Sequence, residues 1–219
     1  MLITSVHNEH IKELDKLKNK KYRDQVGYFL VETKHLALEA YRAGLIKELI
    51  LEQNEIFPMD VPTLYVSKEI LKKLSSTSTP SKVMAVVYKN KLPKEIGEKV
   101  LILDKIQDPG NLGTIIRSAV AFNIDTIICS QDTVDVYNPK VIRASQGMMF
   151  HIPILVQDPE QTIKELHQKD YKVIGTKVTN GEDVRKAAIY SHFALVIGNE
   201  GQGISDKIEN LCDQFLYIK

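Results

Sequence analysis

The stretch 100–120 limits the fold of this chain more than any other segment. Four apolar residues open it, the turn sequence Asp-Pro-Gly-Asn follows, and apolar residues then recur at helical spacing. This pattern predicts a strand, a tight turn and a helix. In an open α/β sheet, ligands collect where such turns leave the carboxyl ends of the strands. Polar residues placed there are the first candidates for chemistry, namely Asp108, Asn111 and Arg117.

The same alternation continues toward the end of the sequence. Strands are expected near 100–104, 126–129, 152–156, 172–176, 193–197 and 214–218. Helices are expected near 111–122, 138–146, 159–169 and 204–211. Apolar strands that alternate with helices favour a mainly parallel sheet covered by helices on both faces. The second half of the chain is therefore predicted to be an α/β domain.

The first part of the chain predicts a smaller α/β module. An amphipathic helix is expected at 8–24, strands at 28–31, 46–51, 63–66 and 83–88, and helices at 34–43 and 67–74. The next stretch contains Pro93 and Gly97 between two strand-like runs, which is typical of a linker. The predicted organisation is thus a domain at 1–90, a linker at 91–98 and a domain at 99–219.

A second stretch of interest, ALVIGNEGQGIS at 194–205, predicts a buried strand and a glycine-rich loop before a short helix. Gly198, Gly201 and Gly203 let the main chain approach a ligand closely. Their spacing matches neither the dinucleotide fingerprint G-x-G-x-x-G nor the phosphate-binding G-x-x-x-x-G-K-[ST]. Taken alone, the loop predicts only a tight turn. A Rossmann-type nucleotide enzyme is disfavoured, because the strand, turn and helix at 100–120 also lack that fingerprint.

The distribution of charge is more informative than its total, which is +1. Residues 1–98 contain 16 Lys and Arg against 13 Asp and Glu, whereas residues 99–219 contain 13 against 15. The basic excess is concentrated in KLKNKKYR at 16–23, which has no acid. Two interpretations stay open: a solvated helix face, or a stripe in which Lys16, Lys20 and Arg23 contact the phosphates of a nucleic acid.

The composition excludes several classes of protein. Of the 219 residues, 43% are hydrophobic and 26% are charged, which is typical of a soluble protein with an adequate core. No apolar run reaches the length of a membrane span and the first ten residues lack a signal-peptide pattern, so a cytoplasmic location without membrane contact is expected. Cys129 and Cys212 lie in apolar contexts without metal-ligand spacing, which predicts buried thiols and no metal site.

Together, the two stretches resemble a known family. DPGNLGTIIRSA and, some eighty residues later, LVIGNEGQGIS are similar to motifs 1 and 2 of the SpoU (TrmH) family of RNA ribose 2′-O-methyltransferases, within the SPOUT class. VIRASQGMMFHIPI at 141–154 looks like the segment between these motifs. The first part of the chain is similar to the substrate-binding domain often fused to SpoU enzymes, which usually has Gly where this chain has Thr33. The resemblance implies a deep trefoil knot in the second domain.

The resemblance also implies a reaction and its partners. S-adenosylmethionine would donate a methyl group to a ribose 2′-hydroxyl of ribosomal or transfer RNA, and the chain would form a homodimer. By motif, Gly198 and Ile218 would contact the donor largely through backbone atoms, with Thr176 lining the same pocket. Judged without the resemblance, Ile218 is a core residue of a strand and Thr176 a strand-end hydroxyl that is satisfied locally.

The resemblance places Arg117 at the acceptor end of the site. Two roles stay open for it: general base, or a cation that binds RNA phosphate and stabilises the forming alkoxide, which is chemically easier because arginine keeps its proton far above neutral pH. Asn111 and Glu200 match the other polar positions of motifs 1 and 2. Asn111 would orient the ribose or hold a loop, and Glu200 would support the site. Arg143 matches a segment close to the active site, where it meets RNA phosphate or lies on a helix surface.

One departure from the family concerns its third motif, a Ser-Leu-Asn loop followed by a final helix. That motif is expected a few residues after Ile218, whereas the sequence stops at Lys219. In the family the loop completes the donor pocket and the helix packs in the dimer interface. Either the sequence is shortened relative to the natural chain, or the protein lacks this element. The second alternative leaves a non-catalytic RNA-binding relative as the rival to the enzyme.

Overall fold

The computed structural model describes residues 2–89, 95–179, 181–188 and 190–217. The chain forms two compact units. The first unit contains Met1–Lys91 and Tyr137–His151, and the second contains Leu92–Val136 and Ile152–Lys219. The segment Tyr137–His151, which lies inside the predicted domain 99–219, therefore packs with the first unit. The predicted linker lies partly outside the described residues.

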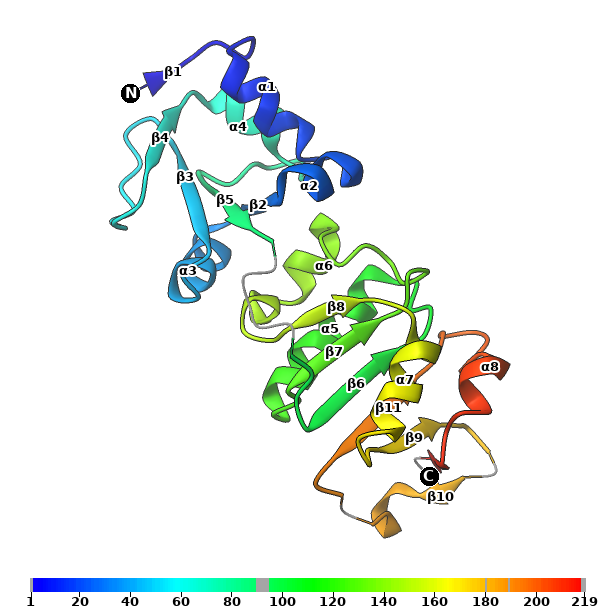
Figure 1. Cartoon of the computed structure of the whole chain (residues 1–219). Helices are drawn as coiled ribbons and strands as arrows, with labels where there is room; N and C mark the ends of the chain where they lie inside the picture. Colours follow the sequence, from blue (N-terminus) through cyan, green and yellow to red (C-terminus); the bar gives the residue numbers. More distant parts are fainter. Residues whose placement is uncertain (1, 90–94, 180, 189, 218–219) are drawn as a thin grey trace. The chain divides into compact units, whose positions relative to one another are not determined.

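A five-stranded mixed sheet forms the centre of the first unit (Figure 1). Its strand order is β1-β4-β3-β5-β2, with β1 and β4 parallel, β4 and β3 parallel, and the remaining pairs antiparallel. The strands are β1 (Leu2–Ile3), β2 (Tyr28–Glu32), β3 (Ile46–Glu52), β4 (Thr63–Val66) and β5 (Val83–Tyr88). The last four confirm the predicted strands to within a residue, whereas β1 was not predicted.

Helices cover both faces of this sheet. On one face α1 (Glu9–Lys16) and α4 (Lys68–Leu74) bury apolar residues against the sheet, among them Ile11, Leu14, Ile70 and Leu74. Helix α3 (Lys34–Arg42) packs on β2, β3 and β5. The alternation of β5 explains how both faces are filled, since successive side chains of a strand point to opposite faces and all of Val83 to Val87 are buried.

The single helix predicted at 8–24 is wrong, because the chain breaks into two helices there. Helix α1 ends at Lys16, and α2 (Lys20–Val26) begins after Asn19, whose side chain accepts a hydrogen bond from the Tyr22 amide. Asparagine competes with the helix for backbone donors and therefore favours such a cap over a helix interior. Arg23 then ties the break together by donating to the carbonyl oxygens of Leu17 (2.8 Å) and Lys18 (2.9 Å).

The segment Tyr137–His151 forms α6 (Pro139–Ala144) and a 3-10 turn, η1 (Met148–Phe150), in the first unit. The ring of Tyr137 lies 4.8 Å from that of Phe29, measured between centroids. Glu39 of α3, only 6% exposed, accepts a hydrogen bond from His151 at 2.9 Å. Gly147 lies so close to α3 that an added Cβ would be 2.7 Å from the Cβ of Glu39. The segment is thus fixed to α3 and β2 by apolar, polar and steric contacts.

In the second unit the described residues form a parallel sheet in the order β10-β12-β9-β11-β6-β7-β8. The strands are β6 (Lys99–Leu103), β7 (Thr126–Cys129), β8 (Ile154–Val156), β9 (Lys172–Thr176), β10 (Glu182–Asp183), β11 (Phe193–Ile197) and β12 (Gln214–Tyr217). The parallel α/β sheet confirms the predicted fold class. The short strand β10 was not predicted, and the trefoil knot stays a prediction.

Helices again cover both faces of the sheet. Helix α5 (Pro109–Ala121) buries Leu112 and Ile116, whereas α7 (Pro159–His167) and α8 (Asp206–Glu209) share a core with β6, β7, β9 and β11. A 3-10 turn, η2 (Val184–Lys186), follows β10. Both cysteines are free thiols. Burial raises the pKa of Cys129 to about 12, and partial burial together with nearby carboxylates raises that of Cys212 to about 11.

Candidate active site at the carboxyl edge of the parallel sheet

The loops that follow β6, β9 and β11 leave the same edge of the second sheet, because these strands are parallel neighbours. The first loop leads into α5 and contains Asp108, whose side chain accepts a hydrogen bond from the Asn111 amide at 2.8 Å. Asp108 therefore caps α5, and Pro109 follows at the first position of the helix, where its missing amide hydrogen costs nothing. The local sequence thus fixes where α5 begins.

Glu200 joins the loop after β11 to the loop after β6. Its Oε1 atom accepts hydrogen bonds from the Asn111 side chain (3.2 Å) and the Asp108 amide (3.3 Å). Its Oε2 atom accepts a hydrogen bond from the Gln107 amide at 3.3 Å. The two stretches singled out in the sequence, about ninety residues apart, therefore meet at one carboxylate.

The electrostatics of Glu200 follow from these contacts. Partial burial raises the pKa of the carboxyl group, but hydrogen bonds from its own backbone amide, from Asn111, and from the Gln107 and Asp108 amides outweigh that effect. The pKa of Glu200 consequently lies below its ordinary value. The group is a carboxylate at neutral pH and acts as an acceptor that holds the loops, which rules it out as a proton donor there.

Two further residues organise this edge and were missed in the sequence. Asp104, which follows β6 and is 2% exposed, accepts a hydrogen bond from the Ser205 amide at 2.8 Å. Asn199 accepts hydrogen bonds from the amides of Gly201 and Gln202, and donates to the Lys105 carbonyl oxygen at 2.9 Å. An acid placed directly after a buried strand was the available signal for Asp104. No signal separated Asn199 from an ordinary turn residue.

The glycines of the second loop have different roles. A Cβ at Gly198 would lie 2.1 Å from the backbone carbon of Gly203, so only glycine fits there. Gly203 has φ +74°, a conformation that favours glycine. A Cβ at Gly201 would meet only the Asn199 Oδ1 atom, at 3.7 Å, and one at Gly203 would meet nothing within 4 Å. The loop is therefore tightly packed at Gly198 and open at Gly201 and Gly203, which leaves its backbone accessible at these two positions and fits a ligand held by backbone atoms.

Thr176 ends β9, next to β11, and donates from its hydroxyl to the Val196 carbonyl oxygen at 3.0 Å. Its only hydroxyl hydrogen is thus used within the sheet, so Thr176 can offer a ligand its methyl group, its backbone or its oxygen lone pairs. It lies close to Gly198, because Val196 is two residues before that glycine. Ile218, the third residue predicted to contact the donor, lies outside the described residues.

Arg117 lies on α5, six residues after Asn111, and its side chain is exposed. That side chain makes no hydrogen bond or ion pair with any residue of the described ranges. The structure therefore places Arg117 on the helix that begins at the Glu200 contact, with its guanidinium available to an anion. The other candidates Asn111, Glu200, Gly198 and Thr176 are brought together at the same edge.

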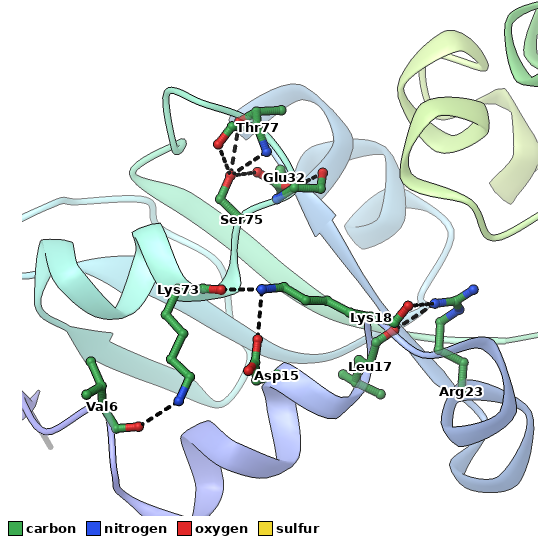
Figure 2. A network of polar contacts seen from close by, with 10 residues as sticks. Val6, Asp15, Leu17, Lys18, Arg23, Glu32, Lys73, Ser75 and Thr77 are labelled. Carbon is green, nitrogen blue, oxygen red and sulfur yellow. Dashed lines mark hydrogen bonds and ion pairs between the residues drawn. The ribbon is translucent and has the colours of Figure 1, made fainter.

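The predicted RNA-contacting residues lie in the first unit. Lys16 and Lys20 are exposed, and Lys16 is paired with Glu13 at 2.6 Å. Arg23 is a correction to the predicted stripe: it is 5% exposed, and its guanidinium holds the two carbonyl oxygens between α1 and α2 (Figure 2). A group so buried cannot reach a phosphate without breaking that turn. Arg143 is half-buried in α6.

Within the described ranges, His, Cys, Asp and Glu side chains form no group of three or more that could hold a metal ion. Among the helices described, none combines the length and the apolar character that crossing a membrane requires.

Comparison with known proteins places this geometry in context. The sequence model of the SpoU rRNA Methylase family matches residues 98–219, and that of the MRM3-like substrate binding domain matches residues 8–85. The 23S rRNA (guanosine(2553)-2′-O)-methyltransferase RlmP of Bacillus subtilis strain 168 is 34% identical over 99% of this chain and 89% of its own length.

Two solved methyltransferase structures are also similar to this chain in fold and in sequence. The AdoMet-bound rRNA methyltransferase from Sinorhizobium meliloti is 26% identical, with a TM-score of 0.86 over 100% of this chain and 88% of that one. The SpoU methyltransferase AviRb from Streptomyces viridochromogenes, solved with AdoMet, is 25% identical, with a TM-score of 0.84 over 97% of this chain and 89% of that one.

Proposed function

The chain belongs to the SpoU rRNA methylase family of S-adenosylmethionine-dependent RNA 2′-O-methyltransferases, and we propose that ribosomal RNA is its acceptor and that the loops joined by Glu200 form its active site. The observation that carries the proposal is the set of hydrogen bonds from Asn111 and two backbone amides to Glu200, which unites motifs 1 and 2 at one edge of the sheet. The rRNA methyltransferases named above favour ribosomal over transfer RNA. A non-catalytic RNA-binding relative is not favoured, because those relatives are methyltransferases.

Gly198, Thr176 and Ile218 would hold the methyl donor at this edge. S-adenosylmethionine supplies an electrophilic methyl group when it is bound. The backbone of the glycine-rich loop suits such a ligand, because its outer side carries no side chains at Gly201 and Gly203. Asn199 and Asp104 keep that loop in one conformation, so the binding surface is formed before the donor arrives.

Arg117 would act on the RNA. An alcohol is a weak nucleophile until it loses its proton, and the developing negative charge on the 2′-oxygen requires a nearby positive group. We assign this electrostatic role to Arg117, together with contact to the adjacent phosphate, because arginine keeps its proton far above neutral pH. Asn111 would orient the ribose or the loop, and Glu200 would hold Asn111 in place.

The test of this assignment is Arg117→Ala, with Ser118→Ala as the matched control, because Ser118 is its exposed neighbour on α5 and its side chain has no hydrogen bond among the described residues. Transfer of radioactive methyl groups to an in vitro transcript of 23S ribosomal RNA measures activity, and calorimetry measures donor binding. We expect the Arg117 variant to lose methyl transfer while donor affinity changes little. Turnover equal to that of the control would remove Arg117 from the mechanism.

The proposal also includes a homodimer that works in the cytoplasm. Family members build their sites close to a subunit interface, and ribosomal RNA is modified where ribosomes are assembled. Light scattering of the purified full chain would report twice the chain mass if it is a dimer. A monomer that still transfers methyl groups would exclude a shared site.

A further inference from the structure

Arg143 is a half-buried cation without a carboxylate partner. The sequence contains five arginines. Arg42 and Arg185 form ion pairs with Glu39 and Asp183, Arg23 is bound to carbonyl oxygens, and Arg117 is exposed to solvent. Arg143, by contrast, is half-buried and is in no ion pair within the described ranges. A partly desolvated guanidinium that touches no carboxylate directly is incompletely compensated, so an anion in direct contact would stabilise it.

One protein group does contact this guanidinium. The Arg143 Nη1 atom donates a hydrogen bond to the Ser76 Oγ atom at 2.8 Å. Arginine has five N–H donors, and the structure gives the other four no partner among the described residues. The contact with Ser76 therefore orients the guanidinium and leaves its other N–H donors free to bind a ligand.

Ser76 is itself held by a buried carboxylate. Glu32, at the end of β2, is 8% exposed. Its Oε1 atom accepts hydrogen bonds from the Ser76 hydroxyl (2.6 Å) and amide (2.7 Å). Its Oε2 atom accepts one from the Ser75 hydroxyl at 2.5 Å, and Ser75 in turn accepts one from the Thr77 amide at 3.0 Å (Figure 2). The polar loop 75–81, which the sequence marks only as turn-rich, is thus fixed at its start.

The three hydrogen-bonded residues Glu32, Ser76 and Arg143 come from segments that are far apart in sequence but lie in the same unit. The Ser76 hydroxyl accepts from Arg143 while it donates to Glu32, so the carboxylate polarises the hydroxyl toward the guanidinium. The backbone of the segment that carries Arg143 is fixed by separate contacts of its neighbours: Tyr137 with Phe29 and His151 with Glu39. Loss of Ser76 would therefore free the side chain of Arg143 and leave the segment in place.

We propose that Glu32 is a positioning residue for RNA binding: through Ser76 it holds the guanidinium of Arg143 ready to bind a phosphate of the RNA backbone. The inference rests on the proposed function, because it takes RNA as the anion. It adds to that function a role for the first unit, in which the buried Glu32 sets the direction of Arg143 on the segment Tyr137–His151. Phosphate suits a guanidinium that still has several donors free, since the two groups match in geometry.

The experiment is a double-mutant cycle in the full chain. Binding of a radiolabelled in vitro transcript of 23S ribosomal RNA is measured for Ser76→Ala, Arg143→Ala and the double variant across a range of salt concentrations. Ser78→Ala is the control, because Ser78 lies in the same loop, is exposed and has no hydrogen bond among the described residues. Glu32→Gln keeps the side-chain volume and tests the acid itself, and thermal melting verifies that every variant is folded.

We expect Arg143→Ala to weaken binding about tenfold and to lower the slope of log affinity against log salt by roughly 0.7 to 1, as for one lost phosphate contact. Ser76→Ala should weaken binding about threefold when Arg143 is present and have no effect when it is absent. Glu32→Gln should follow Ser76→Ala, and Arg143→Lys should restore the salt slope but not the dependence on Ser76.

Two results would overturn the proposal: equal effects of Ser76→Ala with and without Arg143, or wild-type affinity and salt slope in Arg143→Ala. Methyl transfer by the wild-type chain is measured on the same transcript. Coupled binding without any methyl transfer would refute the proposed function and support the positioning role. Methyl transfer without coupling between Ser76 and Arg143 in RNA binding would refute the positioning role and support the proposed function.

Discussion

Thr33, in the first unit, tests how much a positive φ costs a β-branched residue. It joins β2 to α3 with φ +102° and ψ 149°, a conformation that β-branched residues rarely adopt. Its hydroxyl also caps α3 by accepting a hydrogen bond from the Leu36 amide at 3.3 Å. Thr33 therefore combines an unfavourable backbone with a favourable cap, and two substitutions separate the contributions.

Thr33→Gly removes the strain and the cap, whereas Thr33→Ala removes only the cap. Residues held in such a backbone region cost about 1–3 kcal/mol. Glycine costs roughly 0.5–1 kcal/mol in chain entropy and a few tenths as a cap, so the centres of these ranges give a net gain of about 1 kcal/mol of unfolding free energy. Alanine keeps the strained Cβ and loses about 1 kcal/mol with the cap. Thr33 is exposed, so burial adds little to either number.

Urea unfolding followed by circular dichroism would rank the three proteins. The expected order of midpoints is Gly above Thr above Ala, with the glycine variant melting about 2–4 °C above wild type for each kcal/mol gained. If Thr33→Gly were as unstable as Thr33→Ala, the reasoning that the positive φ of Thr33 lowers stability would be refuted.

Three further outcomes follow from the second unit. Gly198→Ala should abolish donor binding in calorimetry, because its Cβ would lie 2.1 Å from main-chain carbon of the same loop, whereas Gly201→Ala, whose Cβ meets only ordinary contact at 3.7 Å, should leave the fold intact. Glu200→Gln should lower stability at pH 7 by about 0.5–1.5 kcal/mol, because one acceptor becomes a donor. The pKa of Glu200 is lowered in the folded state, so its contribution to stability is present above the unfolded pKa of about 4.3 and is lost as pH falls through the folded pKa. The melting curves of the variant and the wild type should therefore converge in acid. Cys129, whose pKa burial raises to about 12, should react with a thiol reagent at pH 8 only after unfolding, whereas the partly exposed Cys212, with a pKa raised to about 11, should react slowly in the native chain; fast reaction of Cys129 in the native chain would show that its burial is incomplete.

Much of the fold could be predicted because the signals are local. Strands β4 and β5 have the predicted bounds, since alternating and continuous apolar runs between turn residues identify strands within a few positions. Helix α5 begins at the Asp-Pro-Gly-Asn turn, where the cap and the proline act over three residues. The break between α1 and α2 was missed because an asparagine inside an amphipathic pattern is consistent with both a cap and an exposed helix face.

The candidate site was predictable only in part. The motif residues Asn111 and Glu200 were singled out, and the structure joins them by a hydrogen bond of 3.2 Å. Asp104 was not, because its importance depends on an amide about one hundred residues away. Arg23 was predicted as a phosphate contact from its charge, yet its neighbours in space are carbonyl oxygens. Charge is visible in a sequence, but burial is a property of the packed chain.

By itself, then, the amino-acid sequence determined the order of most helices and strands, the parallel character of the second sheet and the identity of the two loops. Spacing, turn chemistry and apolar periodicity are properties of neighbouring residues, which explains why they suffice for this. Tertiary structure alone decided that one carboxylate joins both loops, that Arg23 is buried, and that the segment around Arg143 packs in the first unit. These outcomes depend on which distant groups share hydrogen bonds and exclude water, and no local pattern encodes that choice.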